Sequence, residues 1–163
     1  MTRSFDPNSV SLPIGHWIHG EYVEDAGRIE LLRPSDGAAY FCCPVADAAM
    51  VDRAVESAKG ALRTSGWAAC RPRERANILR RWADLIEAEA EELGRLEALA
   101  STRPISQAVA IDVMVTAEQI RFFAEFADKE GGDVVPTDGR HLGMILSEPY
   151  GVIGAITDRK SVV

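Results

Sequence analysis

Three cysteines are the side chains in this sequence with the clearest potential for covalent chemistry. Cys42 and Cys43 are adjacent in a β-prone run, so they point to opposite faces of a strand, and neither stands at a helix N-terminus where a thiol is activated. We expect both to be small buried residues, while a small thiol enzyme stays open as an alternative. Cys70 precedes Arg71 and would have a lowered pKa if exposed, but we favour chance placement in a loop.

The sequence patterns for metal binding, carboxylate catalysis and nucleotide binding are weaker than those for the cysteines. His16 and His19 flank Trp17 while His141 is remote, so we expect surface or strand-edge histidines rather than a three-histidine metal site. The spacing of Gly151 and Gly154 lacks the full Gly-x-Gly-x-x-Gly pattern that leads into a helix. We interpret a cluster of acidic residues as a solubilising helix surface. The cluster comprises Glu87, Glu89, Glu91, Glu92 and Glu97. From the residues alone no active site can be built.

Helices dominate the elements expected in the middle of the chain. Asp47 is a plausible N-cap for a helix with one buried apolar stripe, and Pro72 fits the first turn of the next helix. Leucines continue the helical apolar pattern from Leu93 onward. Pro104 begins another long segment with helical apolar spacing, which ends at the two glycines 131–132. The basic run 71–81 gives way directly to acids, so we interpret it as a solvated helix face.

Short strands are expected on both sides of this helical region. The runs 17–22 and 28–32 predict a small hairpin, and the turn residues 33–37 precede a third strand over 39–45. Near the end of the chain, 142–147 and 151–157 are β-prone. Residues 1–15 are polar and contain two prolines, which indicates a flexible arm.

Composition and charge exclude several classes of protein. The 163 residues carry 18 Lys and Arg against 25 Asp and Glu, a net charge of −7, which gives no basic footprint for nucleic acid. The chain has no secretory leader pattern and no apolar run of the ~18 residues that a membrane span needs. An odd cysteine count argues against a disulfide framework, so we expect a cytoplasmic protein.

Six blocks, read in order, resemble the N-terminal third of the aldehyde dehydrogenase superfamily. WIHGEY (17–22) resembles the family's opening hairpin, RPSDG (33–37) its NPATG turn and VDRAVESA (51–58) its VDRAVEAA helix. RERANILRRWADLI (73–86) resembles its ERARILRRLADLIE helix, RFFAEFADK (121–129) its RYYAxxADK block and EPYGVIGAIT (148–157) its EPxGVVGAIT block. Where the family usually reads TGKP, this chain reads STRP over 101–104, so that Arg103 keeps the cation.

The resemblance implies an α/β fold: the helix-rich N-terminal part of an aldehyde dehydrogenase, with an N-terminal β-hairpin, several long helices and the first strands of an incomplete Rossmann-like cofactor domain. It implies oxidation of an aldehyde to a carboxylic acid through a cysteine thiohemiacetal with NAD or NADP. Ala155, Ile156 and Thr157 match a wall of the cofactor cleft, and Asp112 loosely matches a carboxylate near a structural monovalent cation. The strands from 142 onward resemble the start of the oligomerisation arm and the first cofactor-domain strand, which implies a homo-oligomer at full length.

The chain departs from the family directly after Thr157. The family continues PWNFP, whereas this chain reads DRKSVV over 158–163, which the bases GATCGGAAGAGCGTCGTG of a common sequencing adapter would encode. We therefore hypothesise a flexible arm at 1–15, a partial aldehyde dehydrogenase domain at 16–157 and a non-native tail at 158–163. On this hypothesis the chain contains no catalytic residue. The alternative is a non-catalytic helical interaction module derived from the same family.

Overall fold

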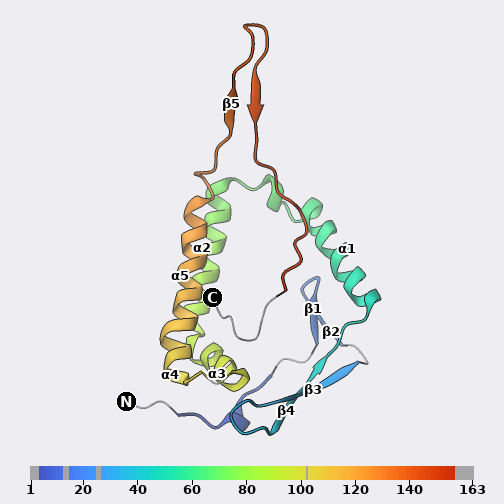
Figure 1. Cartoon of the computed structure of the whole chain (residues 1–163), viewed down its shortest axis with the longest axis vertical. Helices are drawn as coiled ribbons and strands as arrows, with labels where there is room; N and C mark the ends of the chain where they lie inside the picture. The colour runs from blue at the N-terminus through green and yellow to red at the C-terminus, as the bar shows by residue number, and fades with distance from the viewer. Residues whose placement is uncertain (1–3, 13–14, 25–26, 102, 157–163) are drawn as a thin grey trace.

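The computed structural model describes residues 4–12, 15–24, 27–101 and 103–156. Two small antiparallel sheets come first, a helical region follows, and a third antiparallel pair extends from the end of the helical region (Figure 1). The mixture of helices and short strands agrees with the predicted α/β class. Thr157 and the predicted tail at 158–163 lie outside the described residues, so the tail stays a prediction.

The N-terminal strands pair differently from the prediction. β1 (His16–Ile18) pairs with β2 (Glu21–Val23), and β3 (Arg28–Leu32) pairs with β4 (Ala39–Pro44), so the run at 28–32 joins the later strand rather than the first hairpin. The expected turn connects β3 to β4. Gly37 there has φ +71°, a conformation that glycine adopts without steric cost.

Part of the predicted N-terminal arm is held by the turn between β3 and β4. Pro7–Ser9 forms a single 3-10 turn (η1), and the side chain of Asn8 accepts a 3.0 Å hydrogen bond from Arg33. Arg33 is buried and also makes a bidentate pair with Asp36, at 2.9 and 3.0 Å. Residues 7–9 therefore have a specific contact that composition did not reveal, while flexibility elsewhere in 1–15 stays a prediction.

The first helix, α1 (Ala48–Thr64), begins where the sequence predicts. The Asp47 carboxylate accepts a 2.7 Å hydrogen bond from the Met50 backbone N–H, which satisfies one of the free donors of the first turn. The predicted apolar stripe, however, buries no residue against the rest of the described chain. Another 3-10 turn, η2 (Trp67–Ala69), leads to the next helix.

The helical region is organised around an antiparallel pair, α2 (Pro72–Ala88) and α5 (Met114–Phe126), connected by α3 (Ala90–Ala100), α4 (Ile105–Gln107) and a π-helical turn, η3 (Ala108–Val113) (Figure 1). Four buried alanines let the two long helices approach closely: Ala76 and Ala83 of α2, and Ala117 and Ala124 of α5. Pro72 occupies the first turn of α2, as predicted.

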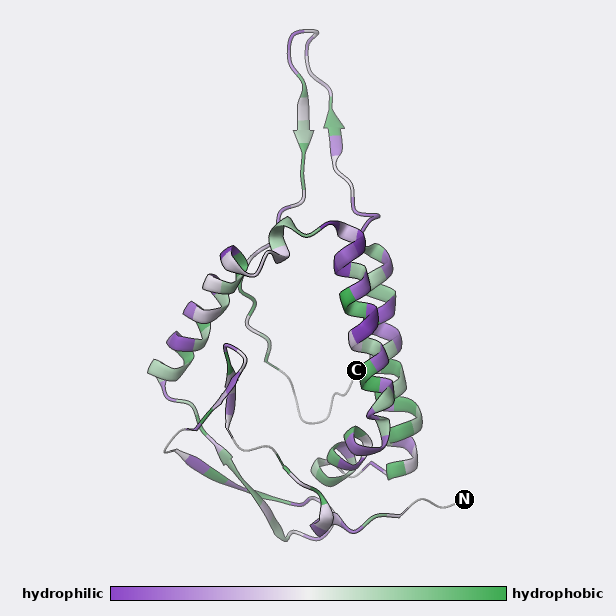
Figure 2. Ribbon diagram, turned by 180° about the vertical axis from the view of Figure 1, so that it is seen from behind, coloured by the Kyte–Doolittle hydropathy of each residue, from purple (hydrophilic) through white to green (hydrophobic). Residues whose placement is uncertain are grey.

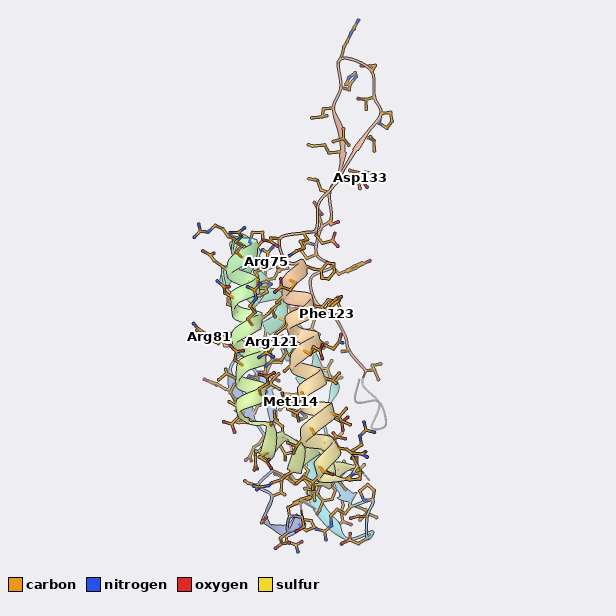
Figure 3. The ribbon with its side chains drawn as sticks, turned by 90° about the vertical axis from the view of Figure 1, so that its left-hand side faces the viewer. Arg75, Arg81, Met114, Arg121, Phe123 and Asp133 are labelled. Carbon is orange, nitrogen blue, oxygen red and sulfur yellow. The ribbon has the colours of Figure 1, made fainter. Side chains whose placement is uncertain are left out.

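Ion pairs fix the register of α2 against α5. Arg73 pairs with Asp128 at 3.4 Å and Arg80 with Glu125 at 2.8 Å. Arg121, between the two helices in Figure 3, donates to Asp84 at 2.7 Å and to both carboxylate oxygens of Glu87. The order of these partners along each helix is opposite, which is the signature of antiparallel packing. Part of the charge assigned to a solvated face therefore joins two helices.

The last described part of the chain differs from the prediction. β6 (Gly143–Ile145) lies inside the predicted run 142–147 and pairs with β5 (Asp133–Val135), a strand that the sequence did not reveal, and this hairpin projects away from the helices (Figures 1 and 2). The strand expected over 151–157 is absent from residues 151–156, which form no ladder. A strand needs a neighbour to satisfy its backbone groups, and no other described strand lies beside this segment.

Candidate functional site

The best-defined polar constellation joins Arg103, after α3, to Asp112 in η3. The guanidinium donates two hydrogen bonds, Nε to Oδ2 at 2.7 Å and a terminal nitrogen to Oδ1 at 2.5 Å. Asp112 is almost fully buried, whereas Arg103 reaches it from a partly exposed position. Two parallel hydrogen bonds to one carboxylate fix both its orientation and its charge.

The electrostatics of Asp112 follow from this pairing. Hydrogen bonds from Arg103 lower the pKa of the Asp112 carboxyl below its usual range, against the opposing effect of desolvation. Both carboxylate oxygens are engaged by a cation of the chain itself. The described residues contain no group of three or more His, Cys, Asp or Glu arranged to hold a metal. The cation-binding role of Asp112 stays a prediction.

A groove of about 370 Å³ lies beside this ion pair. It is lined by Trp82 and Ile86 of α2, Leu93 and Glu97 of α3, Asp112 and Val113 of η3, and Thr116 of α5. The Thr116 hydroxyl donates a 2.8 Å hydrogen bond to the backbone carbonyl of Asp112, which ties α5 to the preceding π-helical turn. The groove is therefore lined mainly by apolar side chains, with one acidic residue from α3 and one from η3.

The sequence did not predict that Trp82, Glu97 and the Arg103–Asp112 pair lie beside one another in one groove. A partial signal exists, because 82 and 86, and likewise 93 and 97, are four residues apart and so share a helix face. These faces meet beside the π-helical turn between α4 and α5, which contributes Asp112 and Val113 to the groove. The residue types around 108–113 do not predict that turn.

The residues predicted to line a cofactor cleft are not assembled into one by the described chain. Ala155 and Ile156 are exposed on the irregular segment after the hairpin, and Thr157 lies outside the described residues. A dinucleotide cleft requires strand ends flanked by helix N-termini, which this segment lacks. The residues present therefore do not hold NAD or NADP by themselves, and their cofactor role stays a prediction.

The cysteines are separate from one another and from the groove. Cys42 is exposed and Cys43 is half-buried, so the expectation of two buried residues is wrong for Cys42 and only partly met for Cys43. The Cys70 thiol lies 3.4 Å from a Glu74 carboxylate oxygen. Desolvation and this neighbouring carboxylate raise the pKa of Cys70, so the thiol has none of the lowering that the sequence allowed for an exposed residue beside Arg71.

The three histidines lie on different elements of the structure. His16 is in β1, and its Nε2 is buried without a hydrogen-bond partner among the residues that the structure describes. His19 is exposed at the turn after β1, where its Nδ1 lies 3.4 Å from Ser57 Oγ. His141 is on the projecting hairpin beside Asp138, with Nδ1 at 2.8 Å from the carboxylate.

No helix in the described part of the chain has both the length and the apolar character needed to cross a bilayer.

Comparison with known proteins gives a consistent result along most of the chain. The model of the aldehyde dehydrogenase family matches residues 22–158. The NADP/NAD-dependent aldehyde dehydrogenase PuuC of Escherichia coli is 37% identical over 142 residues, which is 86% of this chain and 29% of PuuC. Aldehyde dehydrogenase family 2 member B4, a mitochondrial protein of Arabidopsis thaliana, is 33% identical over 141 residues, 85% of this chain and 26% of that protein.

Solved structures agree. A putative aldehyde dehydrogenase from Burkholderia cenocepacia superposes with a TM-score of 0.73 at 40% identity, covering 79% of this chain and 26% of that one. PnpE from Pseudomonas sp. WBC-3 gives a TM-score of 0.74 at 37% identity, covering 80% of this chain and 27% of that one. The chain thus spans between about a quarter and a third of the length of these relatives. With the family model matched over most of its residues, the chain belongs to the aldehyde dehydrogenase family.

Proposed function

We propose that this chain supplies the N-terminal part of an NAD(P)-dependent aldehyde dehydrogenase, which oxidises an aldehyde to a carboxylic acid through a cysteine thiohemiacetal. The observation that carries this proposal is the family match over residues 22–158, together with a fold shared with PnpE. PnpE has also been solved in complex with nicotinamide adenine dinucleotide, again at 37% identity to this chain. In the proposed enzyme the α2–α5 pair acts as scaffold, and 155–157 contribute one wall of the cofactor cleft.

A chimera tests whether this segment functions in a dehydrogenase. The part of E. coli PuuC that aligns with this chain is replaced by residues 22–156, and aldehyde-dependent reduction of NAD+ is followed by absorbance. We expect the chimera to retain activity, because the two segments share 37% of their residues. The control is the same chimera with Gly94→Leu, which disrupts packing between α3 and η3. A folded, soluble chimera without activity would contradict the proposal.

The chain of 163 residues is expected to have no turnover of its own. The resemblance to the family implies that the thiol nucleophile, the glutamate that activates water and the asparagine of the oxyanion hole all correspond to positions after Thr157. Cys42, Cys43 and Cys70 therefore do not take over the role of the nucleophile. Aldehyde-dependent formation of reduced nicotinamide by the purified chain, lost on Cys42→Ser, would instead favour the small thiol enzyme.

A non-catalytic interaction module is the second candidate, and exposed aromatic residues favour it. Trp82 has 54% of its surface exposed and Phe123 64%, although both belong to the best-packed helices of the structure. Co-purification of the tagged chain with a full-length family member, lost on Trp82→Ser and Phe123→Ser, would support this candidate. No association with the dehydrogenase would eliminate it.

Oligomerisation and location complete the proposal. The hairpin over 133–147 projects from the helices with apolar side chains exposed, as expected of an arm that pairs with another subunit (Figure 1). We propose a homo-oligomeric, cytoplasmic enzyme with no nucleic-acid or membrane partner, in keeping with the acidic net charge. Sedimentation of the active chimera with and without residues 133–147 tests the first point.

A further inference from the structure

We propose that the groove between α2, α3 and η3 binds a small organic monocation, namely a primary ammonium group attached to an aromatic or aliphatic body. The groove has about 370 Å³, a volume within the range of small-molecule sites. Its lining combines one surplus negative charge with an apolar floor and an indole ring. The proposal is independent of dehydrogenase activity.

The charge balance of the groove selects a cation. Two lining residues are acidic, Glu97 and Asp112, and Arg103 neutralises Asp112 through its bidentate pair. Glu97 is half-buried, and the structure records no side chain in the described part of the chain that donates a hydrogen bond to its carboxylate. Arg103 interacts with Glu97 electrostatically, but its two side-chain hydrogen bonds go to Asp112. Two carboxylates therefore share one cation, and a ligand ammonium would supply a hydrogen-bond donor to Glu97.

The other walls suit the body of such a ligand. Ile86, Leu93 and Val113 supply apolar contact area, which favours a hydrocarbon portion over a hydrated metal ion. Trp82 lines the same space, and an indole is the best aromatic partner for a cation. Thr116 lines it as well, although its hydroxyl hydrogen is already donated to the Asp112 carbonyl.

A neighbouring groove provides an internal comparison. It has about 400 Å³ and shares Trp82 and Thr116, but its remaining lining residues are Leu79, Gln119, Ile120 and Phe123, none of which is charged. A neutral apolar molecule would find more apolar surface there. Only the groove beside Asp112, of these two, has acidic lining residues, so only this groove is expected to prefer a cation.

The experiment titrates the whole chain with benzylammonium chloride, and with benzyl alcohol as the neutral probe of similar shape. The indole N–H signals of the three tryptophans are followed by NMR, and Trp82 is assigned through Trp82→Phe. We expect benzylammonium to shift the Trp82 signal saturably, and benzyl alcohol to bind at least about fivefold more weakly. Equal affinities of the two probes in the wild-type chain, with benzylammonium affinity also unchanged in Glu97→Gln, would overturn the proposal.

Two matched glutamate variants identify the carboxylate. Glu97→Gln keeps size and helix propensity but removes the surplus charge, so we expect benzylammonium affinity to fall about three- to fivefold while benzyl alcohol affinity is unchanged. Glu118→Gln removes an exposed charge of α5 that does not line the groove, and it should leave both affinities unchanged. An equal loss in the two variants would show only nonspecific attraction to an acidic protein and would contradict the site.

Discussion

The α2–α5 helix pair and the β5–β6 hairpin are neighbours in the chain but differ in what holds them together. The helices bury four alanines and are joined by ion pairs between residues 34 or more positions apart. The hairpin strands contact each other, and Val134 and Leu142 remain 71% exposed. An isolated two-stranded pair is marginally stable in water, so local pairing defines the hairpin whereas tertiary packing stabilises the helices.

The difference predicts that equivalent backbone clashes have unequal consequences. Two glycines test this directly, because each approaches another part of the backbone closely. Gly94 of α3 lies against Val109 of η3, and Gly132 lies against the Ile145 carbonyl in the hairpin. The first should affect the unfolding of the whole helical region, and the second only the hairpin.

Gly94→Ala should have the largest effect. The new Cβ would overlap Val109 Cγ2 and lie 3.1 Å from the Val109 backbone nitrogen, so α3 must move away from η3. We expect the free energy of unfolding to fall by about 2–3 kcal/mol, measured by urea titration followed by circular dichroism. Gly60→Ala is the control, since no atom lies near that Cβ in α1; it should gain about 0.5–1 kcal/mol. Similar stability of the two variants would show that α3 does not depend on this contact.

Gly132→Ala should affect the hairpin alone. Its Cβ would overlap the carbonyl oxygen of Ile145, which belongs to β6. We expect amide exchange in β5 and β6 to become fast, while the free energy of unfolding of the helices changes by less than about 0.5 kcal/mol. Gly139→Ala, at an open position in the hairpin loop, should leave exchange unchanged. A loss of helix stability equal to that of Gly94→Ala would make the hairpin part of the same cooperative unit.

The sequence predicts those features that a few adjacent residues determine. Asp47 and Pro72 mark helix starts because capping and proline geometry act within one turn, and the turn at 33–37 follows from its proline and glycine. The family itself follows from six ordered blocks. Each of these inferences needs no knowledge of the distant chain.

The sequence does not predict features that depend on partners. The segment 151–156 has strand-forming residues but no described neighbour to pair with, and β5 is too short to have a periodic pattern. The α1 stripe is amphipathic yet unburied for the same reason. In the candidate site, Asp112 could be selected as a carboxylate, but its pairing with Arg103 required the π-helical turn. The assigned cofactor residues lack the surroundings that would test them.

Acid should weaken the helical region partly through Asp112. Arg103 lowers the pKa of the Asp112 carboxyl in the folded chain below its value in the unfolded chain. The ionised carboxylate therefore stabilises the folded state fully at pH values above the unfolded pKa. This stabilisation is lost as the pH falls through the folded pKa. We expect thermal midpoints of the wild type to decline below about pH 4, and those of Asp112→Asn to decline less over the same range. Asp138→Asn, which alters a hairpin carboxylate of lowered pKa, should keep the wild-type profile of helix melting. Identical acid profiles for wild type and Asp112→Asn would show that the ion pair does not contribute.

We expect the smallest change in stability when either of two arginines is replaced by glutamine. One arginine forms ion pairs between two helices, and the other forms an ion pair within one helical turn. Arg121 connects α5 to Asp84 and Glu87 of α2, whereas Arg71 pairs with Glu74 in the first turn of the same helix. Arg121→Gln should lower the melting midpoint slightly, and more at low salt than at high salt, because a pair between helices resists their separation and is screened by ions. Arg71→Gln should produce no measurable change, since its side chain is 83% exposed and the pair holds no second element. Equal midpoints for the two variants at low salt would mean that the buried alanines, rather than the charges, hold α2 against α5.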